Sequence, residues 1–305
     1  MFTSTRLLAG VCACVFSSAL LAVDKPNALR KTSFSPPASA GLAGESSAKL
    51  PGLGSTEPLV FSAPPRESAD EANRLYQPVA DYLSRTLGRR VNYVYPRNWL
   101  SYQKEMTKGN YDIVFDGSHF NSWRIQHLQH NTVAKVPEQQ MFAVITRKDN
   151  TQITSLKQLA GKKVCGMGAS NLGVLAMQAE FDAARQPLLM EQISWGRVYE
   201  SVMENRCIAG IVSIAVLRKL DSAGNFTRVI HQSRQLPNQA FSAGPRVTAE
   251  EQGKLAKALT ATESRTILEP VLSANGVADK GLVIASKEDF AGMDTYLKDV
   301  WGYTR

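Results

Sequence analysis

The sequence has 305 residues, of which 44% are hydrophobic and 20% charged. This is enough to bury a sizeable core and more than one compact domain usually needs, so disorder throughout and a fibrous fold are excluded. Lysine and arginine number 35 against 27 aspartates and glutamates, giving a net charge of +8. That balance suits a nucleic acid, an anionic membrane surface or an acidic ligand, and charge alone does not choose among them.

The N-terminus predicts export. Arg6 precedes an uncharged, mostly apolar stretch at 7–22 that ends in small residues, as in a signal peptide. The stretch is shorter than the roughly 20 residues of a membrane-spanning helix, which favours a cleaved signal at 1–22 over an uncleaved anchor. Cys14 could mimic a lipoprotein site, but Cys12 and the short apolar run before it argue against lipidation. We therefore expect a periplasmic protein without stable membrane insertion after cleavage.

Residues 23–57 are rich in Pro, Ser, Ala and Gly and poor in large apolar side chains, which predicts a disordered linker. The globular part from residue 58 carries 30 basic and 24 acidic residues, a net charge of +6. Of the four cysteines, Cys165 and Cys207 lie outside the predicted signal. Two exported cysteines can pair in a disulfide, but two separate buried thiols explain the sequence equally well.

Short apolar runs alternate with amphipathic stretches from Pro58 onward, which predicts an α/β fold with parallel strands. The predicted elements of the first half are a strand at 59–63, a helix from Pro78 to Gly88, a strand at 91–95, a helix at 98–108, a strand at 111–115 and a helix at 118–129. After a strand at 139–146 the pattern begins again, with a strand at 163–168, a helix at 171–184, a short strand around Ile193, a helix at 197–205, a strand at 207–212 and a helix at 213–220. The tail at 248–301 is mainly helical.

Open parallel sheets bind ligands at the carboxyl ends of their strands. The residues that follow the predicted strands include several aromatic side chains, typical of a small-molecule cleft, although single aromatics more often belong to the core. Residues 166–173 (GMGASNLG) bring small residues, a hydroxyl and an amide to a helix start, which suits an anion. The alternative is an ordinary turn capped by Ser170 or Asn171.

The sequence gives no support for catalysis or for a metal. No nucleophile–base pair, GxSxG, HExxH or CxxC pattern is present, so we expect no enzyme and no cofactor. His119 and His130 would lie too far apart on one helix to share an ion, and His127 with His130 supplies only two ligands. We expect these histidines to be solvated surface residues. Export and the absence of a nucleic-acid-binding module argue against a nucleic acid partner.

Several stretches, taken in order, resemble the periplasmic substrate-binding proteins of phosphate, phosphite and phosphonate ABC transporters (PhnD-like). They are YQPVADYLSRTLGRRVNYVY (76–95), KGNYDIVFDGSHF (108–120), ITSLKQLAGKKVCGMGASNLG (153–173), ESVMENRCIAGIVS (200–213), SRQLPNQAFSAG (233–244) and GLVIASKEDFAGMDTYL (281–297). The resemblance implies a type 2 periplasmic binding protein fold, in which two α/β lobes joined by two crossovers close on a ligand. On this reading lobe 1 comprises 58–145 and 239–305, and lobe 2 comprises 146–238.

The family's binding residues transfer only in part. Its Ser-Thr-Ser-Gly run becomes Ser170, Asn171, Leu172 and Gly173. A family Tyr falls on Trp99, a later Tyr near His119 or Phe120, a His on Trp195 and an Asp on Ile208. The predicted ligand-binding residues are Arg66, Tyr95, Trp99, Ser118, His119, Phe120, Ser170, Asn171, Leu172, Gly173, Trp195, Arg197 and Ser213.

The resemblance implies capture of a small anionic ligand, phosphate- or phosphonate-like by family, by lobe closure and its delivery to an ABC transporter permease. The substituted positions point to a changed, partly apolar or aromatic ligand between the Ser170 turn and walls formed by Trp99, Phe120 and Trp195. Arg66 or Arg197 would supply the counter-charge. The alternative function is a sensory or accessory binding protein that addresses a membrane kinase or a redox partner.

Overall fold

The computed structural model describes residues 57–222, 224–277 and 281–301. The predicted signal peptide and all of the predicted linker except Glu57 lie outside the described residues. Two β-sheets, each with helices on both faces, make up the described chain, and both belong to one compact unit. The predicted α/β class with two lobes is confirmed. We call the first sheet with its helices lobe 1 and the second sheet with its helices lobe 2.

Lobe 1 is built on a six-stranded sheet in the order β11-β4-β10-β3-β1-β2. β1 pairs in parallel with β2 and β3, and β10 returns antiparallel between β3 and β4. The strands are β1 (Leu59–Ser62), β2 (Val91–Tyr93), β3 (Ile113–Asp116), β4 (Asn131–Lys135), β10 (Ala240–Ala243) and β11 (Val283–Ile284).

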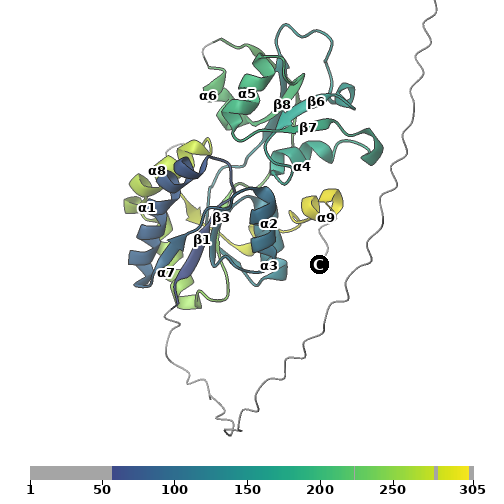
Figure 1. Ribbon diagram of the computed structural model, residues 1–305. Coiled ribbons are helices and arrows are strands. Elements are labelled where there is room, and N and C mark those ends of the chain that lie inside the picture. The colour runs from purple at the N-terminus through teal and green to yellow at the C-terminus, as the bar shows by residue number, and fades with distance from the viewer. Residues whose placement is uncertain (1–56, 223, 278–280, 302–305) are drawn as a thin grey trace, which may run out of the picture. The chain divides into compact units, whose positions relative to one another are not determined.

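Helices cover both faces of this sheet. One face carries α1, α7 and α8, and the other carries α2 and α3 (Figure 1). A single apolar core that includes Phe61, Tyr76 and Phe241 fills the space under α1, α7 and α8. The helices are α1 (Ala69–Leu87), α2 (Trp99–Thr107), α3 (Ser118–His127), α7 (Ala249–Thr260) and α8 (Arg265–Ala274), with 3₁₀ turns at Thr262–Ser264 and Lys287–Phe290.

Lobe 2 is built on a five-stranded sheet in the order β7-β6-β8-β5-β9. Alternation along β5 sends Phe142 and Val144 into the core under α4, and Ala143 and Ile145 into the core under α5 and α6. The elements are β5 (Phe142–Arg147), β6 (Lys163–Gly166), β7 (Leu188–Glu191), β8 (Ala209–Ser213), β9 (Thr227–Gln232), α4 (Leu172–Gln178), α5 (Trp195–Met203) and α6 (Ile214–Leu220), with 3₁₀ turns at Leu156–Leu159 and Ala183–Arg185.

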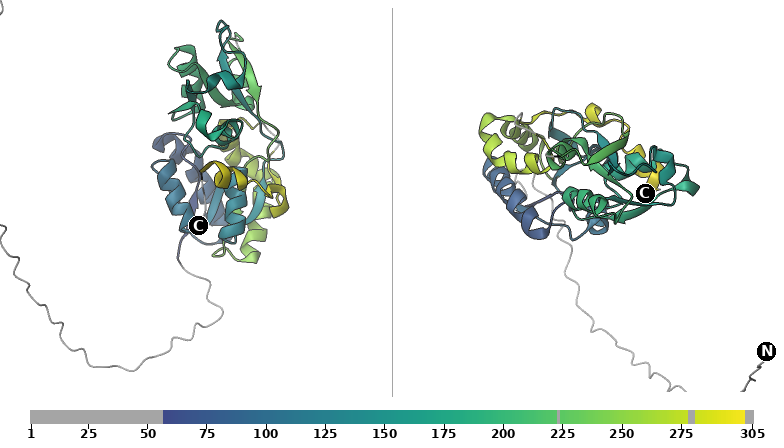
Figure 2. Two further views of the ribbon diagram at one scale, coloured as in Figure 1. Left: turned by 90° about the vertical axis from the view of Figure 1, so that its right-hand side faces the viewer. Right: turned by 90° about the horizontal axis from the view of Figure 1, so that it is seen from above.

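The chain passes between the sheets twice, at 136–141 and at 233–239. These two crossovers run side by side, because Gln140 and Leu236 form an isolated antiparallel bridge and the Val136 N–H donates to the Gln239 carbonyl. β5 belongs to the second sheet, so the lobe boundary expected between residues 145 and 146 falls inside this strand. The last helix, α9 (Thr295–Trp301), packs against α3 of lobe 1 and α4 of lobe 2 (Figure 2).

Two sequence-based expectations are wrong in detail. Pro78 is not the first residue of a helix but lies inside α1, which begins at Ala69 because Ser68 caps it by accepting from the Glu71 N–H. Pro78 faces solvent there, where water can bind the carbonyl that loses its partner. The strand expected around Ile193 is β7 at Leu188–Glu191, and Ile193 lies beyond it with a mostly exposed side chain.

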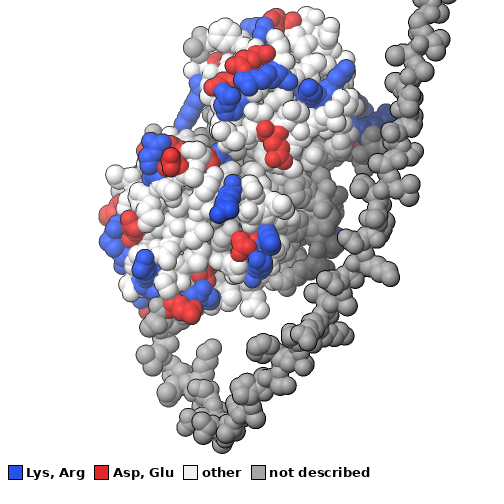
Figure 3. All heavy atoms as spheres, viewed as in Figure 1, with Lys and Arg blue, Asp and Glu red and all other residues white. Residues whose placement is uncertain are grey.

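The surface of the described chain carries charges of both signs. Lysine and arginine side chains are interspersed with aspartate and glutamate on the face seen in Figure 3, with no field of one sign. Among the described residues no helix combines the length and apolarity that crossing a membrane requires.

A disulfide joins Cys165 in β6 to Cys207, which precedes β8. Its sulfurs lie in the core under α5 and α6, and Cys165 comes three residues before Gly168 at the mouth of the candidate site. The bond therefore ties the chain segment that leads into the site to the neighbouring strand.

Replacing both cysteines with alanine should lower the free energy of unfolding by about 2–4 kcal/mol, because the disulfide closes a loop with a sequence separation of 42 residues. Urea unfolding of the wild type and of Cys165→Ala/Cys207→Ala, each with and without reductant, measures this. Reductant should destabilise the wild type alone. An unchanged wild-type midpoint in reductant would contradict the prediction.

Candidate functional site

A small cavity lies where strands of both lobes end. Arg66 follows β1, Trp99 follows β2, and Ser213 ends β8. Its volume is about 20 Å³, room for about one water molecule. The lining residues are Arg66, Trp99, Gly117, His119, Gln140, Phe142, Asn171, Leu172, Trp195, Ser213, Gln239 and Asn275.

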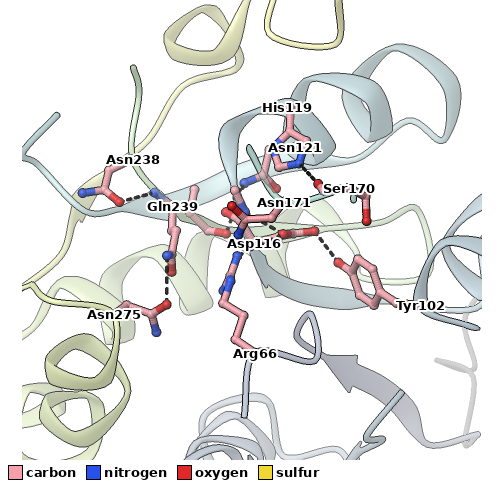
Figure 4. Close-up of polar contacts among 12 residues, drawn as sticks. Arg66, Tyr102, Asp116, His119, Asn121, Ser170, Asn171, Asn238, Gln239 and Asn275 are labelled. Carbon is pink, nitrogen blue, oxygen red and sulfur yellow. Dashed lines mark hydrogen bonds and ion pairs between the residues drawn. The ribbon is translucent and has the colours of Figure 1, made fainter. Parts of the chain in front are cut away.

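The lobe 1 side of the cavity rests on the buried carboxylate of Asp116, the last residue of β3 (Figure 4). One carboxylate oxygen, Oδ1, accepts the Gly117 N–H at 2.6 Å and lies 3.6 Å from an Arg66 nitrogen. The other, Oδ2, accepts from Arg124 Nη1 at 3.1 Å and from the Tyr102 hydroxyl. Burial and the adjacent carboxylate raise the pKa of Tyr102 well above its usual value, so its hydroxyl remains a donor.

The Arg66–Asp116–Arg124 cluster has two positive charges and one negative charge, so one positive charge has no counter-charge within it. Two guanidinium groups, of Arg66 and Arg124, share the single carboxylate of Asp116. Arg66 Nη1 is buried and has no hydrogen-bond partner among the described residues, although a buried charge is costly unless it is paired. The neighbouring Glu67 offsets the charge only in part, since burial raises the pKa of its carboxyl to about 7 despite the Arg66 charge.

A hydrogen bond connects the lobes beside the cavity. His119 Nε2 lies 2.9 Å from the Ser170 carbonyl oxygen. A carbonyl only accepts, so Nε2 carries the proton and Nδ1, which has no partner, is an acceptor. Burial lowers the pKa of His119 to about 4, which keeps the ring neutral.

The expectation of solvated surface histidines is wrong for His119 and His130, which are 2% and 3% exposed. His130 packs under β10 beside Ser242, and burial lowers its pKa to about 3. His119 is buried because the first residues of α3 are covered on all sides, whereas His130 lies beyond the helix, between α3 and β4. Within the described ranges, no three histidine, cysteine, aspartate or glutamate side chains come together in a way that could hold a metal ion.

Aromatic side chains close the cavity. The Trp99 ring lies directly against Gly168 of lobe 2, where even a Cβ atom would fall 1.9 Å from Trp99 Cδ1. Gly168 is thus required for this approach of the lobes. Across the cavity, the Trp195 ring lies 6.1 Å from that of Phe142, centroid to centroid.

Seven of the predicted ligand-binding residues line the cavity: Arg66, Trp99, His119, Asn171, Leu172, Trp195 and Ser213. Ser118 and Ser170 are next to lining residues and are fully buried, and their hydroxyls have no hydrogen-bond partner.

Four of the predicted ligand-binding residues do not line the cavity and make other contacts. The Tyr95 hydroxyl donates to the Glu67 carbonyl, and Phe120 packs against Tyr102 inside the lobe 1 core. Gly173 gives space to the Phe142 ring. Arg197 pairs with Glu200 on the surface.

Five lining residues were not predicted: Gly117, Gln140, Phe142, Gln239 and Asn275. Gly117 directly follows β3 and could have been found by the strand-end rule. Gln140 and Gln239 come from the crossovers and Asn275 ends α8, so none of them follows a parallel strand.

A protein-family model described as "ABC transporter, phosphonate, periplasmic substrate-binding protein" matches residues 61–290, which is most of the chain. The chain belongs to this family. Its members are substrate-binding proteins of transport systems in the periplasm, which confirms the function expected from the sequence at this level. No curated protein matches the sequence.

Solved structures share the fold at low sequence identity. PhnD1 from Prochlorococcus marinus in complex with methylphosphonate is 14% identical, with a TM-score of 0.66 over 80% of this chain and 98% of that one. A protein from Xanthomonas citri bound to ATP is 13% identical, with a TM-score of 0.64 over 81% and 99%. A binding protein component of a phosphonate ABC transporter from Pseudomonas aeruginosa is 14% identical, with a TM-score of 0.60 over 78% and 85%.

The free energy of unfolding should decrease as the pH is lowered, because His119 is buried in its neutral form. Between the ordinary histidine pKa of about 6.5 and its folded value of about 4, the unfolded state binds a proton that the folded state does not, so the free energy of unfolding decreases as pH drops through this range. His119→Gln should remove up to about 3 kcal/mol of this loss. Urea unfolding from pH 7 to 4 measures it.

His127→Gln, at a partly exposed position of the same helix, is the control and should keep the wild-type slope. The prediction fails if His119→Gln and wild type lose stability in parallel.

Proposed function

We propose that this chain captures a small phosphate- or phosphonate-type anion at Arg66 and delivers it to an ABC transporter permease in the membrane. The observation that carries the proposal is the uncompensated positive charge of the Arg66–Asp116–Arg124 cluster beside the cavity. An anionic ligand would neutralise that charge and give Arg66 Nη1 the partner it lacks.

The rest of the lining suits such a ligand. The Ser213 hydroxyl and the Asn171 side chain face the cavity from lobe 2, and the buried Ser170 hydroxyl lies next to Asn171. Trp99 and Trp195 supply apolar walls that exclude water and accommodate a carbon substituent. Few polar groups and aromatic walls favour a compact anion with an organic part.

Binding requires the lobes to move. A cavity of about 20 Å³ does not hold a phosphoryl group, so the His119–Ser170 hydrogen bond and the Trp99–Gly168 contact must give way for entry. The two crossovers at 136–141 and 233–239 are the natural hinge. Because a ligand stabilises the arrangement that it contacts best, closure around the anion would form the surface that a permease recognises.

The proposal includes export. The N-terminal signal at 1–22 would direct the chain to the periplasm and be removed during export.

Arg66→Gln should weaken binding of methylphosphonate about 30-fold or more, since losing one partner of a buried charge pair costs about 2 kcal/mol or more. Arg197→Gln is the matched control, because Arg197 pairs with Glu200 on the surface and does not line the cavity. Isothermal titration with methylphosphonate and inorganic phosphate measures both. Loss of binding in Arg197→Gln but not in Arg66→Gln would show that the anion does not bind at Arg66. If wild type binds neither anion, the proposal is refuted.

Glu67→Gln should raise the affinity for methylphosphonate at pH 8 about five-fold and change it little at pH 6. The carboxyl of Glu67 has a pKa of about 7, so only above this value does its negative charge repel the ligand, by roughly 1 kcal/mol. Titrations of both proteins at each pH test this, with the variant compared with wild type at the same pH. Equal affinities at pH 8 would exclude Glu67 as a modulator.

A further inference from the structure

A second, larger cavity adjoins the candidate site along the crossovers. Its volume is about 290 Å³, at the lower end of small-molecule pockets. Gln140, Ser213 and Asn275 line both cavities, so the two are neighbours around the same side chains. The second cavity is bordered by the first crossover, by Asn238 of the second, by the start of α6 and by the end of α8.

A chain of hydrogen bonds fixes which atom Gln239 presents at this junction (Figure 4). The Asn275 Nδ2 donates to the Val271 carbonyl at 2.8 Å, and a carbonyl can only accept. Asn275 Oδ1 is therefore an acceptor, and the Gln239 Nε2 donates to it at 3.0 Å. The remaining Gln239 polar side-chain atom, Oε1, must be an acceptor, and within the part of the chain that the structure describes it is buried without a partner.

The acceptor Gln239 Oε1 needs a hydrogen-bond donor. Gln239 is 7% exposed and lines the smaller cavity, and a buried polar atom without a partner costs about 1–3 kcal/mol. The carboxamide of Gln140 lines both cavities and that of Asn238 the larger one, where Glu138 and Arg218, of opposite charge, also line the wall. A carboxamide pairs well with a hydroxyl group, because each can both donate and accept a hydrogen bond. A carboxamide carries no charge, so it cannot neutralise a charged substituent.

We infer that the ligand has two parts: an anionic phosphoryl head at Arg66 and a hydroxyl-bearing tail that donates a hydrogen bond to Gln239 Oε1 in the smaller cavity and extends past Gln140 and Asn275 into the larger one. This rests on the proposed function for the head and adds the chemical class of the ligand, a hydroxylated phosphate or phosphonate.

Three probes with the same head separate the parts: methyl phosphate, n-propyl phosphate and glycerol 3-phosphate. Isothermal titration of the wild type should give about tenfold tighter binding of glycerol 3-phosphate than of n-propyl phosphate, which converts to about 1.4 kcal/mol. The two differ by hydroxyl groups on a tail of equal length, so the ratio reports hydrogen bonding and not size.

Gln239→Leu removes the acceptor and should reduce that ratio to about two-fold or less; the ratio compares two ligands with the same head in the same variant, so a change in head binding does not affect it. The methyl phosphate titration shows that the variant is folded. Gln152→Leu makes the same change at an exposed position outside both cavities and should keep the wild-type ratio.

If wild type binds all three probes equally, the tail site is wrong and the head site stands. If the ratio is present in wild type and persists in Gln239→Leu, the tail is recognised elsewhere and the inference is overturned. If none of the probes binds, the proposed function fails and the inference fails with it.

Discussion

The binding side of lobe 1 depends on one buried carboxylate. Asp116 is the last residue of the central strand β3, and its carboxylate accepts a hydrogen bond from the Gly117 N–H that follows. It also accepts from Arg124 of α3 and from the Tyr102 hydroxyl of α2. These bonds fix the segment that carries Gly117 and His119 into the cavity. Because Arg66 and Arg124 together outweigh Asp116, the same cluster that orders the segment leaves positive charge beside the cavity. On the proposed function, the side chains of Asp116, Arg66 and Arg124 therefore both order this segment and favour an anionic ligand.

The two lobes meet through contacts that oppose free opening. The His119–Ser170 hydrogen bond and the Trp99–Gly168 contact lie on the cavity side, and the paired crossovers lie behind them. α9 adds a third connection: Leu297 packs with Phe120 of lobe 1 and Leu175 of lobe 2, and Arg234 of the second crossover lies over the Tyr296 ring. Movement about the crossovers must therefore also shift or detach α9.

Strand and helix order could be predicted from the sequence because apolar runs and amphipathic stretches reflect local geometry. The strand-end rule also found Arg66, Trp99 and Trp195, which follow predicted parallel strands. Local pattern could not find Gln239 and Asn275, because their place beside the cavity comes from a crossover and a helix end brought together only by the tertiary fold. It could not separate Arg66 from Arg197 either, since only the structure reveals that Glu200 pairs with the second. The burial of His119 was missed because a helix this polar gives no sign of which face is covered, and that of His130 because the tertiary fold covers the short segment between α3 and β4.

The antiparallel insertion of β10 has a consequence for how the chain is assembled. Lobe 2 is formed by one continuous run, from β5 to β9, whereas the sheet of lobe 1 is not complete until β10 pairs Ala240 with Asp116 and separates β3 from β4. A chain synthesised from its N-terminus onward must hold the first strands of lobe 1 with an unfilled gap until all of lobe 2 has been made. Such delayed closure of distant strands is slow and exposes unpaired edges, so the half-formed lobe 1 sheet is the stage at which this protein most needs protection.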